Sequence, residues 1–242
     1  MSGRMLMTAP AQAQQQGRQP DGLGGLWFGV VPASVLSLDD PEGWGRVQVI
    51  LPWSPDPESE RYFAWARMAT LFAGADRGSW FLPDVGDEVL VAFEHGDPRR
   101  PYVLGGLWNG QDNPPEAANH SEANNRKLLR TRNGVMVTLD DSDGQEKLTL
   151  ETPGGQKVEL ADGPGTITAE DSNGNSVKLD PSGITVTASA LVKVEASTVQ
   201  IDATAVTVNA ATATFSGVVN AQTVVATTIS GATYTPGAGN IW

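Results

Sequence analysis

The sequence contains no cysteine and only two histidines, His95 and His120. Without cysteine the chain has no disulfide scaffold, no thiolate metal site and no cysteine nucleophile, and two histidines do not suffice for a histidine-rich metal site. The sequence also lacks any run approaching the ~20 apolar residues that a membrane-spanning helix requires. We therefore expect no cofactor and no metal centre.

Basic residues are scarce as well, because 16 Lys and Arg stand against 28 Asp and Glu, giving a net charge of −12. Such a chain repels phosphate backbones, so no nucleic-acid partner is expected. Residues 1–22 lack the apolar run of roughly 7 to 15 residues found in a secretion signal. Their Gln, Ala, Pro and Gly content predicts a flexible N-terminal tail.

Aromatic residues divide the chain, since 13 of the 16 Trp, Phe and Tyr residues precede residue 111. We expect the first half to be organised around large rings and the second half to be filled by Val, Ile, Leu, Ala and Thr. Residues 111–127 are rich in Asn, Pro, Glu and Ala without periodicity, which predicts a linker.

The first half shows short alternating runs separated by Gly, Pro and Asp. These runs predict five strands, over residues 26–31, 45–51, 62–70, 87–94 and 101–108. Five short strands within residues 23–110 are typical of a Greek-key barrel of the OB-fold type.

The second half alternates strands and Gly, Asp or Asn turns about every ten residues up to residue 183. From Ile184 onward the glycine turns disappear, and pairs of apolar residues at positions i and i+2 recur every seven or eight residues. A coiled coil is disfavoured because the i, i+2 spacing belongs to strands and because Thr and Val dominate where helix formers would be expected.

The 40 residues after Asp202 contain no charged side chain. Short strands with one apolar face and free edges would aggregate as monomers, whereas three identical chains around one axis would pair their edges and bury their apolar residues. The fold class is therefore predicted as all-β, an OB-fold barrel followed by a trimeric intertwined β-helix (a β-prism needle) over residues 128–233. The predicted trimer core consists of Ile184, Val186, Val192, Val194, Val199, Ile201, Val206, Val208 and Phe215.

Residues 234–242 break the strand pattern and end on two large apolar side chains. Three copies of this segment would either present an apolar platform for a tip protein or cap the trimer core themselves. The candidate tip-binding residues are Tyr234, Pro236, Gly237, Asn240, Ile241 and Trp242.

No motif predicts catalytic or metal-binding residues. Residues 140–144 and 171–175 resemble fragments of a calcium loop but lack the later bidentate Glu, so they are interpreted as turns. His95 has no nucleophile pattern around it, and Arg99 and Arg100 are expected to form surface ion pairs, with a hub or subunit contact as the alternative.

Four segments carry a family resemblance: residues 45–53 (GRVQVILPW), 65–70 (WARMAT), 81–101 (FLPDVGDEVLVAFEHGDPRRP) and 103–110 (VLGGLWNG). They resemble the OB domain of the central spike proteins of contractile injection systems, which include phage baseplate assembly protein V, tailocin spikes and the VgrG proteins of type VI secretion. The resemblance implies a homotrimer on a baseplate hub, with a β-helical needle that punctures membranes and seats a small PAAR-type tip protein. Because the 22 residues of the tail are too few to form a hub, the hub is expected to be a separate protein.

The resemblance further implies assembly in the bacterial cytoplasm, a place in the baseplate of a virion or injection particle, and transient contact with the target envelope. We therefore expect a structural protein and not an enzyme. The alternative is a β-helical polysaccharide-binding or depolymerase tailspike, which would need paired carboxylates on one face of the rod. An OB-fold nucleic-acid binder is opposed by the 6 basic and 12 acidic residues of residues 23–110.

Overall fold

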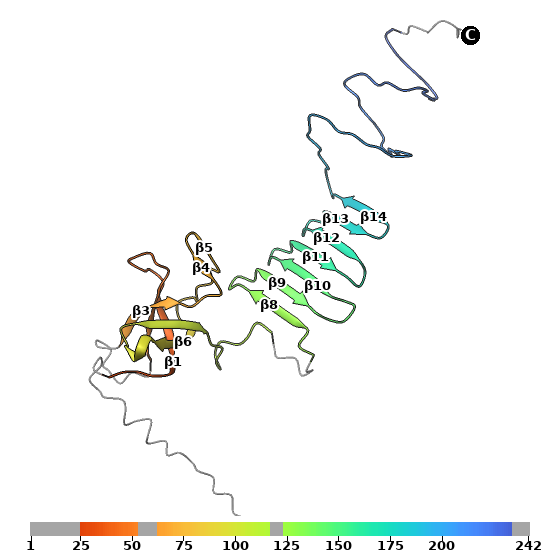
Figure 1. Cartoon of the computed structure of the whole chain (residues 1–242). Helices are drawn as coiled ribbons and strands as arrows, with labels where there is room; N and C mark the ends of the chain where they lie inside the picture. The colour runs from red at the N-terminus through yellow and green to blue at the C-terminus, as the bar shows by residue number, and fades with distance from the viewer. Residues whose placement is uncertain (1–24, 53–61, 117–122, 234–242) are drawn as a thin grey trace, which may run out of the picture. The chain divides into compact units, whose positions relative to one another are not determined.

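The computed structural model describes residues 25–52, 62–116 and 123–233, and its regular structure consists almost entirely of strands (Figure 1). The chain divides into two units, Met1–Ser189 and Ala190–Trp242. Within the described ranges the helical structure is one short 3-10 turn, η2 (Glu94–Gly96), and no helix there is long and apolar enough to cross a membrane. The predicted all-β class is confirmed.

The first part of unit Met1–Ser189 is a closed barrel of five strands in the order β1-β2-β3-β7-β6. Its strands are β1 (Val30–Ser37), β2 (Val47–Ile50), β3 (Phe63–Met68), β6 (Glu88–Phe93) and β7 (Pro101–Gly106). Neighbouring strands run antiparallel except β3 and β7, whose parallel pairing closes the barrel. This is the predicted OB-like architecture.

The predicted first strand at residues 26–31 is wrong, because β1 runs from Val30 to Ser37 and includes Pro32. Proline normally interrupts a strand because it lacks the backbone N–H. Here β1 pairs with β6 from Val30 to Ser34, with Pro32 opposite Leu90, so the strand continues through the proline.

The barrel core is mainly aliphatic, which corrects the expectation of a domain organised around large rings. The buried residues are Ala33, Val35, Val47, Val49, Leu51, Ala66, Val89, Val91, Phe93 and Val103. The rings of Trp27 and Tyr62 pack against Phe93 at centroid distances of 5.2 and 6.3 Å, and the Tyr62 hydroxyl donates to the Pro98 carbonyl. Most of the other described rings of the barrel are exposed.

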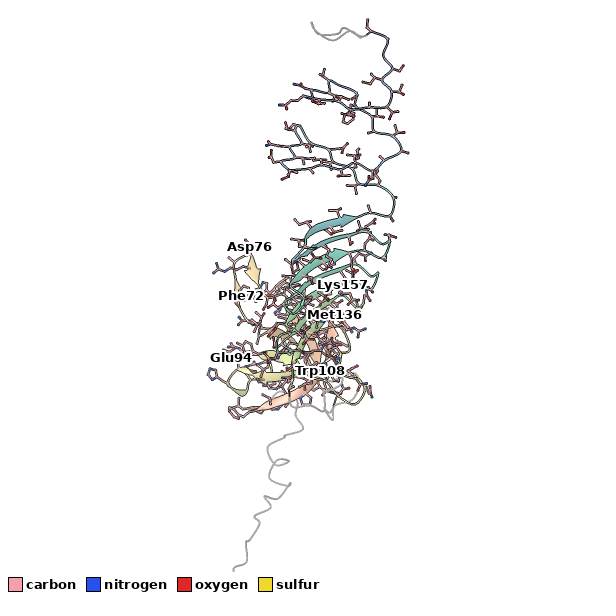
Figure 2. All side chains as sticks on the ribbon, turned by 90° about the vertical axis from the view of Figure 1, so that its right-hand side faces the viewer. Phe72, Asp76, Glu94, Trp108, Met136 and Lys157 are labelled. Atoms are coloured by element: carbon pink, nitrogen blue, oxygen red, sulfur yellow. The ribbon has the colours of Figure 1, made fainter. Side chains whose placement is uncertain are left out.

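A small hairpin, β4 (Ala73–Gly74) and β5 (Arg77–Gly78), projects from the barrel and had not been predicted. Figure 2 shows Phe72 and Asp76 on this hairpin. Its strands are only two residues long, so they leave no alternating pattern in the sequence.

The second part of this unit is a seven-stranded antiparallel sheet in which each strand pairs with the next along the chain (Figure 1). The strands are β8 (Arg126–Arg130), β9 (Met136–Asp140), β10 (Lys147–Glu151), β11 (Lys157–Ala161), β12 (Thr166–Glu170), β13 (Ser176–Asp180) and β14 (Gly183–Thr187). The turn signals in the sequence predict strands over residues 135–139, 147–151, 157–160, 166–169 and 176–179, which agree with β9 to β13 within one residue at each end. β8 was missed, and it begins inside the predicted linker.

The unit Ala190–Trp242 has no strand among its described residues, 190–233, although the sequence predicts strands there. Figure 1 shows this part of the chain running back and forth in extended passes that do not pair with one another. A strand needs a hydrogen-bonded neighbour, and the single chain supplies none.

Candidate functional surfaces

One face of the β8–β14 sheet carries two rows of aliphatic side chains, which together we call the apolar face. Strand register aligns Leu129, Val137, Leu150, Val158, Ala169, Val177 and Val186 in one row, and Leu139, Leu148, Leu160, Ile167, Leu179 and Ile184 in the other. The second row begins at Lys127 on β8, whose Nζ lies 2.7 Å from the Asp141 carboxylate. Period-two alternation places these residues on the same side.

The apolar face is exposed in the single chain. The exposed fraction of its larger side chains reaches 71% at Ile184 and is 37% at Leu179, while Val137 and Leu148 are half-buried. The opposite face is polar yet better covered, since Thr138 and Ala161 are buried there. Because a stable protein covers aliphatic surface before polar surface, the apolar face requires a partner.

The opposite, polar face of the β8–β14 sheet carries several ion pairs. Lys157 Nζ lies 3.0 Å from Glu159 and 4.0 Å from Glu170, and these carboxylates raise the pKa of Lys157. Lys178 lies 3.0 Å from Asp180 on the same strand. This face is suited to water.

Two of the nine predicted trimer-core residues lie on the apolar face. Ile184 and Val186 end its two rows on β14, and the other seven residues lie in the unit Ala190–Trp242. All nine are exposed, with no described residue of the chain covering them. Their role in a trimer core therefore remains a prediction. The candidate tip-binding residues Tyr234, Pro236, Gly237, Asn240, Ile241 and Trp242 lie outside the described residues.

The barrel presents a second candidate surface, formed by Trp44, Trp65, Trp80 and Arg46, which we call the tryptophan surface. Trp44 and Trp80 are exposed, whereas Trp65 is half-buried and the Arg46 side chain is only 15% exposed. The Arg46 guanidinium lies 5.1 Å from the Trp44 ring and 5.9 Å from the Trp65 ring. Its Nη2 lies 2.6 Å from Asp40, and this hydrogen-bonded pairing holds the pKa of Asp40 well below its ordinary value. Trp80 packs over Gly45. Trp, Tyr and Arg are the residues that dominate binding energy in protein interfaces.

The arginines Arg99 and Arg100 form the predicted surface ion pairs. Arg99 Nη2 lies 2.8 Å from Asp97, and Arg100 Nη1 lies 3.6 Å from Glu94. The hydrogen bonds from Arg99 lower the pKa of Asp97 to about 2. His95 occupies η2 with a φ of 51°, so it belongs to a tight turn.

The sequence resembling a calcium loop at Asp171 is a turn, as predicted. Its carboxylate accepts hydrogen bonds from the backbone N–H of Asn173 at 2.8 Å and of Asn175 at 2.9 Å, and from Asn175 Nδ2 at 2.7 Å. These bonds stabilise the ionised carboxylate and lower its pKa to about 2. The described residues contain no group of three or more His, Cys, Asp or Glu side chains arranged to hold a metal ion.

Comparison with known proteins gives a match for each part of the chain. Residues 31–108 match the type VI secretion system/phage-baseplate injector OB domain. Residues 147–214 match the phage baseplate V C-terminal trimerisation domain, a range that includes eight of the nine predicted core residues, all except Phe215.

Several named proteins are similar to part of the chain. The type VI secretion system spike protein VgrG1b of Pseudomonas aeruginosa is 29% identical over 124 residues, which is 48% of this chain and 17% of the relative. The spike protein VgrG3 of Vibrio cholerae is 31% identical over 113 residues, 45% of this chain and 11% of the relative. The actin cross-linking toxin VgrG1 of Vibrio cholerae is 29% identical over 112 residues, 44% of this chain and 10% of the relative. The chain thus spans less than a fifth of the length of these relatives.

Proposed function

The chain belongs to the family of phage baseplate V and VgrG-like spike proteins, and we propose that three copies of it form the central spike of a contractile injection machine. In this proposal the barrels attach to the baseplate hub, and the residues from β8 onward form a needle that pierces the target envelope. The role is mechanical and requires no catalytic residue, in keeping with relatives that are named spike proteins.

The observation that carries this proposal is the exposed apolar face. One row of aliphatic side chains crosses all seven strands and a second crosses the six strands β9 to β14, and a contiguous surface of this kind marks an interface. In a three-fold arrangement the apolar faces of three chains would meet around one axis and leave the charged faces in water. The match to a trimerisation domain supports a homotrimer.

The extended passes of residues 190–233 support the same assembly. Buried backbone N–H and C=O groups must be paired, and unpaired strand edges attract other chains. Since these passes have no strand partner within the described part of the chain, neighbouring copies would supply the missing hydrogen bonds. A needle built in this way has few free edges and resists bending.

The mass of the full chain in solution tests the trimer. Light scattering should give about 76 kDa, three times the 25.5 kDa of one chain. The trimer should also resist SDS and protease, because no strand can leave without breaking contacts to two other chains. A species of 25.5 kDa at micromolar concentration would refute the proposal.

We place the hub contact on the tryptophan surface. Trp44 and Trp80 are both 71% exposed, and their replacement by alanine should weaken co-purification with the hub protein of the same machine at least tenfold. Trp108 is equally exposed but lies outside this surface, so Trp108→Ala is the matched control. Equal capture of all three variants would show that the hub binds elsewhere.

At the other end of the proposed needle, residues 234–242 are assigned to a PAAR-like tip protein. A chain that lacks them should remain trimeric but no longer co-purify with the tip protein. Loss of the trimer would instead show that the segment caps the core. Retained binding would assign tip recognition to residues before 234.

A further inference from the structure

Three turns on one edge of the β8–β14 sheet share the same five-residue form. They join β8 to β9, β10 to β11 and β12 to β13, and their sequences are TRNGV (131–135), TPGGQ (152–156) and DSNGN (171–175). In each turn the backbone N–H of the first residue donates to the carbonyl of the fifth, and the fourth residue is a glycine with a φ between 84° and 88°. This pattern is the local signal that returns the chain antiparallel to itself.

The chain that leaves β14 at the same edge lacks this pattern. The next five residues are ASALV (188–192), with no hydroxyl or carboxylate at the first position and a leucine at the place of the glycine. No strand within the described residues follows β14, and its outer edge is the end of the sheet. A free strand edge can accept either the next segment of its own chain or a neighbouring copy.

The side chain of Asn175 joins the last of the three turns to the departing chain. Its Nδ2 donates to the Asp171 carboxylate at 2.7 Å, so the amide oxygen remains available as an acceptor. That oxygen accepts hydrogen bonds from the Ser189 backbone N–H at 2.9 Å and from Ser189 Oγ at 3.2 Å. The half-buried Asn175 therefore holds the chain two residues beyond the end of β14 at Thr187.

Within the described residues, the fifth residues of the other two turns make no such link. Val135 has no hydrogen-bonding side chain, and Gln156 Oε1 accepts from Thr152 Oγ1 at 2.6 Å, inside its own turn. Both of these turns lie between strands that continue the sheet, whereas the link from Asn175 coincides with the last strand. The link therefore marks the point at which the hairpins end.

We propose that Asn175 is a positioning residue, which holds Ser189 at the sheet edge so that the chain after β14 pairs with neighbouring copies and does not fold back as another hairpin. The inference rests on the proposed trimer, in which residues 190–233 obtain their strand partners from other copies. Because a slip of one residue turns every side chain to the opposite side, a fixed starting point sets the register of the needle. Val192 and Val194 form the first predicted core pair after Ser189 and depend on that register.

Spin labels on the full-length chain test this assignment, because the chain contains no cysteine. Lys193→Cys reports on the chain after Ser189, and Thr185→Cys reports on β14. Both positions are exposed in the single chain, and residue 193 lies on the opposite side from its two valine neighbours, so neither label enters the predicted core. Double electron–electron resonance then measures the distances between copies within each trimer.

The informative variant is Asn175→Val, which copies the fifth residue of the first turn. It keeps the backbone hydrogen bonds of its own turn and loses the link to Ser189. We expect narrow distance distributions at both label positions in the unchanged chain. In Asn175→Val the distribution at position 193 should become about twofold broader or more, because the register is no longer fixed. The distribution at position 185 and the mass of about 76 kDa, three chains of 25.5 kDa, should stay unchanged.

Two variants serve as matched controls. Asn173→Ala removes a side chain that donates to Asp171 from the same turn at 3.2 Å but is not part of the link. Ser189→Ala removes only the longer bond, from Oγ, and keeps the backbone N–H that Asn175 holds. Both should retain the narrow distribution at position 193.

An unchanged distribution at position 193 in Asn175→Val would overturn the inference. Equal broadening at both label positions, or loss of the trimer in this variant, would also overturn it, because either result would show a general loss of stability and not a loss of register. A monomeric unchanged chain would contradict the proposed function itself, so light scattering of that chain separates the two failures.

Discussion

Substitution of two adjacent residues on β14 tests directly which face of the sheet forms the trimer interface. Ile184 ends a row of the apolar face, and Thr185 lies on the polar face opposite Lys178. Both side chains are exposed in the single chain, so aspartate at either position should hardly affect the fold of one chain. In a trimer the two positions differ, because Ile184→Asp places three carboxylates at the interface, whereas Thr185→Asp places each one beside a lysine.

The expected difference is large. Full burial of an isoleucine side chain is worth about 3 kcal/mol, and the 71% of Ile184 that is exposed in one chain corresponds to about 2 kcal/mol per copy. The trimer would lose about 6 kcal/mol from three copies, roughly a 10⁴-fold weaker association, before the desolvation of the carboxylates adds several kcal/mol for each ion.

The assay is light scattering over a dilution series, with the unchanged chain and Thr185→Asp as references. Ile184→Asp should elute as a 25.5 kDa monomer at concentrations where both references remain trimeric. If Ile184→Asp and Thr185→Asp form equally stable trimers, the apolar face is not the interface.

Three further predictions concern the core, a turn and the barrel. Val194→Asp should abolish trimer formation by light scattering, and normal assembly would show that the inward register is wrong by one residue. The pKa of Asp171 lies at about 2, below its ordinary value of 3.8. The hydrogen bonds to its ionised carboxylate therefore stabilise the folded chain above about pH 4, and this stabilisation is lost as the pH falls toward 2. Calorimetry should show a smaller acid-induced drop in Tm for Asp171→Asn than for the unchanged chain. Gly45→Ala should lower barrel stability by more than the about 1–2 kcal/mol of left-handed strain alone, because its Cβ would lie 2.7 Å from the Trp80 ring. Gly43→Ala is the control, because Gly43 also has a positive φ, 66°, but no atom lies within 4 Å of the added Cβ. The stability of both variants is measured by denaturant unfolding, and an equal loss of stability in the two would exclude the clash with Trp80.

The strands of the second half could be predicted from local signals alone. Turns rich in Gly, Asp and Asn bracket short alternating runs, so the predicted range of residues 147–151 coincides with β10. Alternation also showed that each strand has one apolar side. Both features depend only on residues close together in the chain, which is why the sequence suffices for them.

The apolar face also depends on register, which local signals do not specify. Leu148, Leu160 and Ile167 form a row only because each hairpin turn holds its two strands in the same alignment. For the same reason β8, with two positive charges at its start and no strong alternation, was not predicted as a strand, and its first two residues were assigned to the linker; it is recognisable only as the partner of β9. The sequence placed the predicted core at residues 184–215, whereas the structure extends the apolar face back to Leu129.

Tertiary structure alone decided the barrel interior. Sequence composition suggested a core of rings, but the closed barrel is filled mainly by valine and alanine side chains. Exposure depends on the path of the chain around each residue, and local sequence does not give that path. Trp44 and Trp80 are therefore 71% exposed, whereas Trp27 of the same domain packs against the core residue Phe93.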